Sequence, residues 1–269
     1  MNSINKQIAI VTGASAGLGA EFARQLVSKG YGLLLIARRL DRLQLLADEL
    51  KAEFGVAAKA RPCDLADPAA LEILCSEIES RNDVSILVNN AGFGVPGKLT
   101  YADGEQLEKQ TIAHVLAPMK LARAVLPGMI EKRHGAIVNV SSVAAFVPAP
   151  GTVNYHATKA YEAAFSEALA LELKGTGVYV QALCPGFTHT EFHAVSGFDK
   201  KQVPMRWWLN ADFVVRTSLR EVSRRDARGM PRGRTIVVPG WGYRLAVNML
   251  NTLPRPLVWA ASRFRPTSK

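Results

Sequence analysis

Short runs of consecutive apolar residues alternate along this chain with longer stretches in which apolar residues recur every three or four positions. The apolar runs span residues 8–11, 33–37, 56–61, 84–88, 136–140, 178–183 and 235–238. Helical spacing occupies approximately residues 18–29, 38–54, 68–80, 104–132 and 154–174. Unbroken apolar strands are typical of sheets that are buried on both faces, and strands that alternate with helices are parallel. The pattern predicts an α/β fold with a doubly wound, seven-stranded parallel sheet in a single domain over residues 1–269.

The least regular stretch, residues 187–212, follows the sixth predicted strand. It is longer than an ordinary connection, and we expect it to form a substrate loop or lid. It carries large side chains that favour a bulky apolar substrate, although they would also suit a packed hinge: Phe192, Phe198, Met205, Trp207 and Trp208. His189 and His193 are further candidates for the wall of a substrate pocket.

The composition is that of a folded globular protein, with 48% hydrophobic and 21% charged residues among 269. Disordered, collagenous, coiled-coil and polytopic membrane chains are disfavoured. Cys63, Cys75 and Cys184 cannot all pair and lack metal-ligand spacing, which favours a reducing compartment and predicts no metal site. No signal peptide is visible and no apolar run approaches the length of a membrane-spanning helix, so we expect a cytoplasmic protein.

Charge is distributed unevenly along the chain. Residues 1–199 contain 18 Lys+Arg and 20 Asp+Glu, whereas residues 200–269 contain 15 Lys+Arg and 3 Asp+Glu. The basic C-terminal segment, residues 241–269, combines arginines with amphipathic anchors such as Trp241, Tyr243 and Trp259. Peripheral contact with an anionic membrane is one interpretation; a solvated rim, or a segment that covers a cleft or meets another subunit, is the alternative. No recognition motif supports nucleic-acid binding.

A glycine-rich turn follows the first predicted strand and leads into the first helix. Glycines let the backbone approach a pyrophosphate closely, and the helix N-terminus offers N–H groups to it. The G-x-x-x-G-x-G spacing differs from the commoner fingerprint, but its place in a βαβ unit predicts dinucleotide binding in a Rossmann-type fold. The expected cofactor contacts are Gly13, Ser15, Ala16, Gly17, Leu18 and Gly19.

The residues after the second strand indicate which dinucleotide binds. An NAD site places an acidic residue here to hold the ribose 2′-hydroxyl, whereas this chain has Arg38 and Arg39. Two guanidinium groups can clamp a 2′-phosphate through charge-assisted hydrogen bonds, which predicts NADP(H) as the cofactor. The alternative is that both arginines simply begin a charged helix.

Two further strand ends carry candidate cofactor contacts. After the third strand, Asp64 either accepts a hydrogen bond from the adenine amino group or caps the helix near Pro68. After the fourth strand, the small residues of Asn89-Asn90-Ala91-Gly92 let the backbone pass near the adenine ribose, unless they form an ordinary turn. The expected contacts at these two ends are Asp64, Leu65, Asn90, Ala91 and Gly92.

The candidate chemistry comes from a serine, a tyrosine and a lysine. Ser142 ends the fifth strand, and Tyr155 and Lys159 follow at helical i and i+4 positions, where they share one face. Together with the glycine turn, this set resembles the short-chain dehydrogenase/reductase (SDR) family over at least residues 7–190. Residues 89–92 resemble its N-N-A-G motif. Three segments resemble its ketoacyl-reductase-like bacterial branch: residues 37–39, 184–192 and 234–240.

The resemblance implies further site residues and an assembly. The segment after the sixth strand resembles the family's P-G segment that touches nicotinamide, which adds Pro185, Gly186, Thr188 and Thr190 as cofactor contacts. Tyr155 would act as general acid for carbonyl reduction and general base for alcohol oxidation, because a nearby ammonium and an oxidised nicotinamide favour tyrosinate. Ser142 would steady the developing oxyanion, and Lys159 would also bind the nicotinamide ribose. The family implies a homodimer or homotetramer.

The chain departs from the family pattern at one position. The family usually has an asparagine in the long helix before strand five, whose main chain holds a water that joins the lysine to solvent. His114 stands there in this chain. A main-chain contact would survive the change, whereas a side-chain role would make proton relay slower or sensitive to pH near neutrality; a purely structural histidine is the alternative.

Two hypotheses follow for the function. The first is an NADP(H)-dependent oxidoreductase that interconverts a carbonyl compound, either a ketone or an aldehyde, with the corresponding alcohol. The substrate of this enzyme would be apolar. The second is an NADP(H)-binding protein that senses the cofactor or docks at a membrane, with weak or no catalysis. Turnover on a panel of carbonyl compounds distinguishes them.

Overall fold

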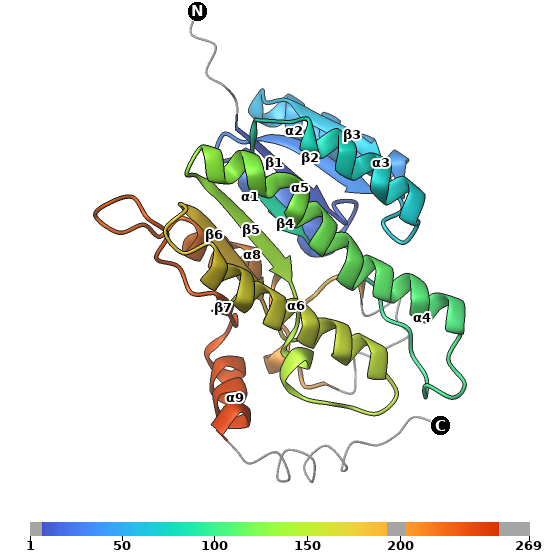
Figure 1. Cartoon of the computed structure of the whole chain (residues 1–269). Helices are drawn as coiled ribbons and strands as arrows, with labels where there is room; N and C mark the ends of the chain where they lie inside the picture. The colour runs from blue at the N-terminus through green and yellow to red at the C-terminus, as the bar shows by residue number, and fades with distance from the viewer. Residues whose placement is uncertain (1–6, 193–202, 253–269) are drawn as a thin grey trace, which may run out of the picture.

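The computed structural model describes residues 7–192 and 203–252 of the chain. Seven strands form one sheet in the order β3-β2-β1-β4-β5-β6-β7, and every neighbouring pair is parallel (Figure 1). The strands are β1 Ile8–Thr12, β2 Gly32–Ala37, β3 Ala58–Pro62, β4 Val84–Asn89, β5 Gly135–Val140, β6 Val178–Leu183 and β7 Ile236–Val237. The predicted doubly wound, seven-stranded parallel sheet is confirmed.

Helices cover both faces of the sheet because successive strand residues point to opposite sides. Val11 and Leu35 belong to a core that is covered by α1 (Gly17–Val27), α2 (Leu40–Phe54) and α8 (Ala211–Val222). Ile10 and Leu34 belong to the opposite core, beneath α3 (Pro68–Glu79), α5 (Ala117–Glu131) and α6 (Val153–Glu172). Figure 1 looks onto the face that carries α3, α5 and α6.

The strand order places the functional edge of the sheet. The chain runs outward from β1 through β2 to β3, then returns to β4 on the other side of β1. In such sheets ligands bind beyond the carboxyl ends of the strands at this reversal. The glycine turn, the end of β4 and the end of β5 therefore meet at one edge.

The helical region expected over residues 104–132 is present, but it is not one regular α-helix. The structure has α4 (Gly104–Thr111), a π-helical turn η1 (Ile112–Leu116) and then α5. The N–H of Ala117 donates to the carbonyl of Ile112, five residues back. Pro118 has no N–H, so the His114 carbonyl lacks its usual α-helical donor. A wide turn of this kind moves the His114 side chain away from where a regular helix would hold it.

The region after β6 contains more helix than the sequence analysis expected. Helix α8 begins at Ala211, inside the predicted 187–212 loop, and buries an apolar stripe that includes Val214, Val215 and Leu219. Short 3-10 turns η2 (Val143–Phe146) and η4 (Met205–Trp207) and helix α9 (Trp241–Thr252) complete the described elements. No helix in the described ranges is long and apolar enough to cross a membrane.

Candidate active site

The glycine turn after β1 has a backbone that side chains would obstruct. Gly13 has a φ of +64°, in the left-handed region that favours glycine. A Cβ on Gly19 would lie 2.2 Å from the Gly13 carbonyl oxygen, which is far inside van der Waals contact. Gly17 also has a positive φ and faces Thr190, another predicted cofactor contact. The turn is thus a backbone cradle at the N-terminus of α1, which suits an anionic group.

The N-N-A-G segment supports this cradle from beneath. The Asn90 side-chain amide donates to the carbonyls of Thr12 and Gly13 at 3.0 and 3.3 Å. The Thr12 hydroxyl accepts from the N–H groups of Asn90 and Ala91 at 2.9 and 3.0 Å. These contacts hold the ends of β1 and β4 together, so Asn90 and Ala91 shape the site from below. Thr12 was not among the predicted site residues.

The arginines after β2 bind an anionic side chain of the chain itself. Arg39 donates to the Ser15 hydroxyl at 3.0 Å and to the Glu191 carboxylate at 3.3 Å. Arg42 donates to both oxygens of Glu191 at 2.9 and 3.0 Å, and it holds the pKa of Glu191 below its usual value, with help from Arg39. Arg38 points to Asp64, 4.0 Å away. Arg38, Arg39 and Ser15 were predicted cofactor contacts, whereas Arg42 and Glu191 were not.

One alternative for Asp64 was wrong. The cap of α3 is Asp67, whose carboxylate accepts from the N–H groups of Ala69 and Ala70. Asp64 instead accepts from the N–H of Ala66 at 3.0 Å in the preceding turn and remains partly exposed at the sheet edge. Its neighbour Leu65 is buried in the core. Only Asp64 of this pair offers a polar side chain to the edge of the sheet.

Ser142, Tyr155 and Lys159 come together above the ends of β5 and β6. Ser142 lies close enough to Tyr155 for its hydroxyl to favour the phenolate and so to lower the pKa of Tyr155, and it accepts from the N–H of Ala144 at 3.1 Å. The Lys159 ammonium lies 5.8 Å from the centre of the Tyr155 ring. The Ser141 hydroxyl donates to the Lys159 carbonyl at 2.7 Å, which ties α6 to β5.

The pKa of Tyr155 in the chain alone differs from the expectation. Burial raises the pKa of Tyr155 above its usual value, while Lys159 and Ser142 act in the opposite direction without overcoming it. Glu162 adds to the rise. The expected lowering by Lys159 is present, but it is smaller than the effect of burial. Tyr155 is therefore protonated at neutral pH, which suits a general acid.

The partner of Lys159 was not anticipated. Its ammonium donates to both carboxylate oxygens of Glu162 and to the Val140 carbonyl, and both side chains are buried. A carboxylate three residues after a lysine is visible in the sequence, but such pairs usually lie on a solvated face. Their burial follows from packing of α6 on the sheet.

His114 is fully buried, and both ring nitrogens have partners. Nε2 accepts from the N–H of Phe93 at 3.1 Å, and Nδ1 lies 3.0 Å from the Thr158 hydroxyl, which donates to the Tyr155 carbonyl. Burial, followed by the charge of Lys159, lowers the pKa of His114 well below its usual value. A Cβ on Gly92 would lie 2.8 Å from Nε2, so glycine makes room for the ring. The neutral ring joins the N-N-A-G segment to the catalytic helix.

The P-G segment after β6 is held by helix α9. The Tyr243 hydroxyl accepts from the N–H of Phe187 at 3.0 Å and donates to the Trp207 carbonyl at 2.7 Å. A Cβ on Gly186 would overlap the Tyr243 ring. Pro185 and Thr188 are buried in this segment, and the Thr188 hydroxyl donates to the Gly186 carbonyl. Of the two interpretations of residues 241–269, membrane contact and cover of a cleft, the contacts of Tyr243 agree with the second.

Among the described aromatic residues after β6, one lies beside Tyr155 and two pack against neighbouring residues, as a hinge would. Phe192 lies beside Tyr155, with ring centres 5.8 Å apart. Trp208 is buried, stacks on His189 and donates through its indole N–H to the Val203 carbonyl. Trp207 packs against the ring of Tyr243. The hinge alternative therefore applies to both tryptophans, while Phe198, His193 and Trp259 lie outside the described residues.

Comparison with known proteins agrees with this geometry. The family model described as short chain dehydrogenase matches residues 7–200. The chain belongs to the short-chain dehydrogenase family. A short chain dehydrogenase of Pseudocercospora fijiensis is 43% identical over 192 residues, which are 69% of this chain and 61% of that relative. The chain therefore spans less than two thirds of that relative's length.

Two solved structures of this family resemble the whole chain. A short-chain dehydrogenase from Sphingobium yanoikuyae in complex with NADPH has a TM-score of 0.82 and 32% identity, and covers 98% of each chain. The bulky-bulky ketone specific alcohol dehydrogenase from Comamonas testosteroni has a TM-score of 0.78 and 27% identity, covering 98% of this chain and 97% of that one. The family fold thus extends beyond the matched residues 7–200.

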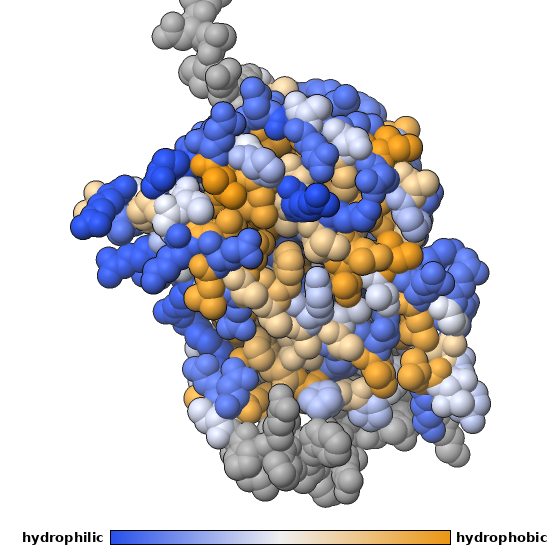
Figure 2. All heavy atoms as spheres, in the orientation of Figure 1, coloured by the Kyte–Doolittle hydropathy of each residue, from blue (hydrophilic) through white to orange (hydrophobic). Residues whose placement is uncertain are grey.

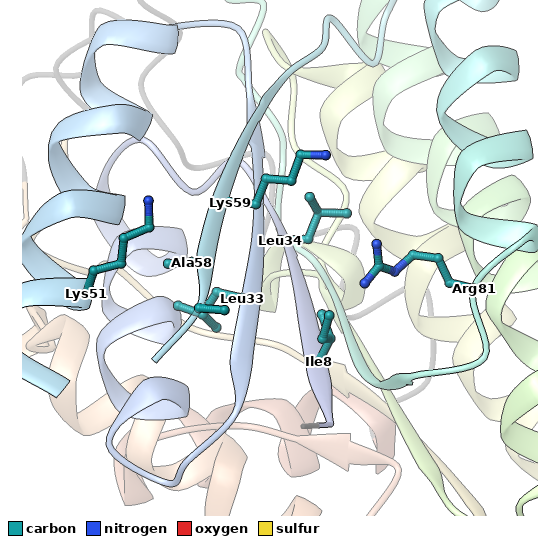
Figure 3. Close-up of a pocket in the computed structure, with 8 residues that line it drawn as sticks. Ile8, Leu33, Leu34, Lys51, Ala58, Lys59 and Arg81 are labelled. Carbon is teal, nitrogen blue, oxygen red and sulfur yellow. The ribbon is translucent and has the colours of Figure 1, made fainter. Parts of the chain in front are cut away.

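The residues at the sheet edge fit the nicotinamide dinucleotide that short-chain dehydrogenases bind. The glycine cradle has no room for side chains, and the guanidinium groups of Arg39 and Arg42 already bind one carboxylate. Cavities elsewhere in the described residues are less suited to a dinucleotide. The pocket in Figure 3 lies at the opposite, amino ends of β1 and β2, with an apolar floor of Ile8, Leu33 and Leu34. It is remote from Ser142, Tyr155 and Lys159, which lie beyond the carboxyl ends of the strands.

Proposed function

We propose that this chain is an NADP(H)-dependent oxidoreductase that interconverts a ketone or aldehyde with its alcohol, with Tyr155 as general acid and base. The observation that carries the proposal is the convergence of Ser142, Tyr155 and Lys159 at the sheet edge, next to a glycine cradle. When bound, the reduced nicotinamide supplies a hydride to the carbonyl carbon. No metal takes part in this proposal.

The side chains divide the remaining work. Tyr155 gives its phenolic proton to the carbonyl oxygen as negative charge develops there. The Ser142 hydroxyl is placed to donate to the same oxygen and to steady the charge. Lys159 stabilises the phenolate that remains and would hold the nicotinamide ribose. In the reverse direction, the Tyr155 phenolate accepts the alcohol proton.

His114 has a positioning role in this proposal. Its two ring nitrogens join the Phe93 N–H to the Thr158 hydroxyl, and that hydroxyl contacts the main chain of Tyr155. Because the neutral ring is held by hydrogen bonds at both nitrogens, we propose that the His114 side chain does not relay protons. This choice favours the structural alternative for His114.

The preference for NADP(H) over NAD(H) rests on charge. Arg39 donates to Ser15 beside the glycine cradle, and it shares Glu191 with Arg42. The two residues that directly follow β2, Arg38 and Arg39, are basic, where an NAD site would place an acidic residue to hold the ribose 2′-hydroxyl. A 2′-phosphate offers the guanidinium groups the same kind of oxygen anion that Glu191 offers now. The NADPH complex of the Sphingobium relative is consistent with this preference.

The substrate proposed here is apolar and bulky. Phe192 and Phe93 lie near Tyr155 and His114, so the neighbourhood of the reacting hydroxyl is aromatic. The ketone-specific relative from Comamonas acts on bulky ketones according to its description. The substrate loop expected over residues 187–212 lies partly outside the described residues, and its described part brings Phe192 beside Tyr155.

We propose that the chain self-associates through the face of α5 and α6. Large apolar side chains of α5, α6 and the adjoining η1 are exposed: Ile130, Tyr161, Leu171 and Leu116. Figure 2 shows apolar surface between charged groups on this side of the molecule. Light scattering should give a dimer or tetramer, and Leu171→Lys should weaken the association. A monomeric wild-type chain would contradict this part of the proposal.

The decisive test removes one hydroxyl group. Tyr155→Phe should lower turnover by about 10²-fold or more, because general acid catalysis contributes that much. NADPH binding, followed by cofactor fluorescence, should change little. Tyr161→Phe is the matched control, since Tyr161 lies on α6 but is half exposed. Undiminished turnover of Tyr155→Phe on a carbonyl panel would overturn the mechanism, and absence of turnover in the wild type would favour a sensing or docking protein.

A further inference from the structure

Helix α6 carries a buried carboxyl group that the mechanism above does not use. Glu162 follows Tyr155 by seven residues and Lys159 by three, so the three side chains lie along one side of the helix. Glu162 is only 3% exposed. A buried carboxylate is costly unless it is paired, so its partner explains why this residue type is tolerated there.

Every hydrogen-bonding position of the Lys159 ammonium is occupied within the chain. Nζ donates to the two carboxylate oxygens of Glu162 at 3.0 and 2.9 Å and to the Val140 carbonyl at 2.9 Å. An ammonium has three N–H groups. While both contacts to Glu162 persist, Lys159 has no donor left for another partner, and the carboxylate offsets much of its charge at Tyr155.

No other titratable group described around Glu162 binds the Lys159 ammonium. Cys184, at the end of β6, is a buried thiol whose pKa burial raises to about 12, so it stays protonated. His114 of η1 faces Lys159, and its ring nitrogens are bonded elsewhere. Strand β5 and turn η2 have no titratable residues, and Tyr243 of α9 is bonded to Phe187 and Trp207. The charged residues of α4 are exposed or paired with one another: Glu105, Glu108 and Lys109.

We propose that Glu162 is a positioning residue that shares Lys159 with Tyr155. As an anion, Glu162 holds the ammonium against the Val140 carbonyl and offsets its charge; as a neutral acid, it leaves that charge to act on Tyr155. The proposal rests on the proposed function, in which Tyr155 donates the proton to the carbonyl oxygen. Glu162 thereby links the acidity of Tyr155 to the pH of the solution.

The direction of this link follows from the charges. Burial raises the pKa of Glu162 to about 7, against the opposing influence of Lys159, so both forms are populated near neutrality. Below that pH the carboxyl is neutral, the charge of Lys159 is uncompensated, and Tyr155 is the stronger acid. Above it, the carboxylate raises the pKa of Tyr155. Carbonyl reduction should therefore weaken as pH rises through the ionisation of Glu162.

The first experiment needs neither substrate nor cofactor. The near-ultraviolet absorbance of tyrosinate is titrated in the wild type and in Glu162→Gln, each compared with the same protein carrying Tyr155→Phe. Glu162→Gln should lower the pKa of Tyr155 by on the order of 1, because a nearby unit charge is removed in a site of low dielectric constant. Glu162→Asp retains the charge and should stay near the wild type. Glu167→Gln, exposed on the same helix, is the matched control.

The second experiment follows the pH profile of kcat/KM for carbonyl reduction. The wild type should show an ionisation near neutrality that Glu162→Gln lacks and Glu162→Asp retains at a shifted position. A purely structural role would lower activity by the same factor at every pH and leave the shape of the profile unchanged.

Two outcomes would overturn the inference. One is a folded Glu162→Gln protein with an unchanged pKa of Tyr155 and an unchanged profile. If that variant does not fold, carboxyl-carbon NMR of the wild type decides, with the resonance assigned through Glu162→Asp; ionisation of Glu162 at or below the usual value for glutamate would refute the proposal. Because the tyrosinate titration is independent of turnover, failure of the proposed function, detected with Tyr155→Phe, is a separate result.

Discussion

Replacement of Glu191 by glutamine should tighten NADPH binding, because Glu191 competes with the cofactor for the same guanidinium groups. In the chain alone its carboxylate accepts hydrogen bonds from Arg39 and from Arg42. If Arg39 binds the 2′-phosphate, as proposed, these contacts must break first. Glutamine keeps the size of the side chain and removes its charge.

The expected magnitude is modest because the pairs are solvated. The side chains of Arg39, Arg42 and Glu191 are 42%, 44% and 51% exposed. Exposed ion pairs contribute about 0.2–1 kcal/mol each, so two of them amount to about 1 kcal/mol. That corresponds to NADPH binding about fivefold tighter in Glu191→Gln at low salt, with the difference shrinking as salt screens the charges.

The assay is fluorescence titration with NADPH and NADH at two salt concentrations. NADH lacks the 2′-phosphate, so its affinity should change much less. Glu49→Gln is the matched control, since Glu49 forms a similarly exposed pair with Arg24 away from the site. Equal tightening for NADH and NADPH, or unchanged NADPH binding, would refute the assignment of these arginines to the 2′-phosphate.

Two further predictions concern the cradle and the C-terminal helix. Gly19→Ala should weaken NADPH binding at least about tenfold and destabilise the fold by about 1–3 kcal/mol, because its Cβ would meet the Gly13 carbonyl at 2.2 Å; Gly104→Ala, where a Cβ meets nothing within 4 Å, is the control for thermal unfolding and binding. The chain should stay in solution with anionic vesicles, because α9 packs its inner side on the site through Tyr243 and Val247. Co-sedimentation that is lost when the exposed stripe of α9 is made polar would instead establish membrane docking; the stripe is Trp241, Leu245 and Met249.

The sheet was predictable from sequence because most of its strands are runs of apolar residues that are buried on both faces; the edge strand β3, which carries Lys59 and Arg61, is the exception. Strand ends differ from the structure by two residues or fewer, as with β3, which begins at Ala58 rather than residue 56. The site residues at the strand ends were placed by the same logic, since parallel strands bring their carboxyl ends to one edge. Ser142 reaches Tyr155 for this reason.

Two helices show where periodicity fails. A π-helical turn preserves helical spacing on either side, so nothing in the pattern of residues 104–132 marks the interruption at η1. Helix α8 was overlooked because its first residues fall within the stretch read as an irregular loop, and its short apolar stripe is interrupted by polar residues. Its arginines 216 and 220 are on the solvent side or its margin, while Val214, Val215 and Leu219 are buried. The excess of basic residues over residues 200–269 therefore gave no indication of the buried apolar residues of α8.

Hydrophobic periodicity also failed to predict the polar residues that are buried on the core-facing side of α6. Lys159, Glu162 and Ser166 occupy core-facing positions at i, i+3 and i+7, where an apolar stripe would be expected. Each has a partner: Lys159 and Glu162 pair with each other, and Ser166 accepts from the Asn139 amide. Since a buried ion pair rarely adds stability compared with apolar side chains of similar volume, stability alone does not account for Glu162. Besides its pairing with the buried Lys159 ammonium, the proposed effect on the charge beside Tyr155 gives a second physical reason for a carboxyl group at this position.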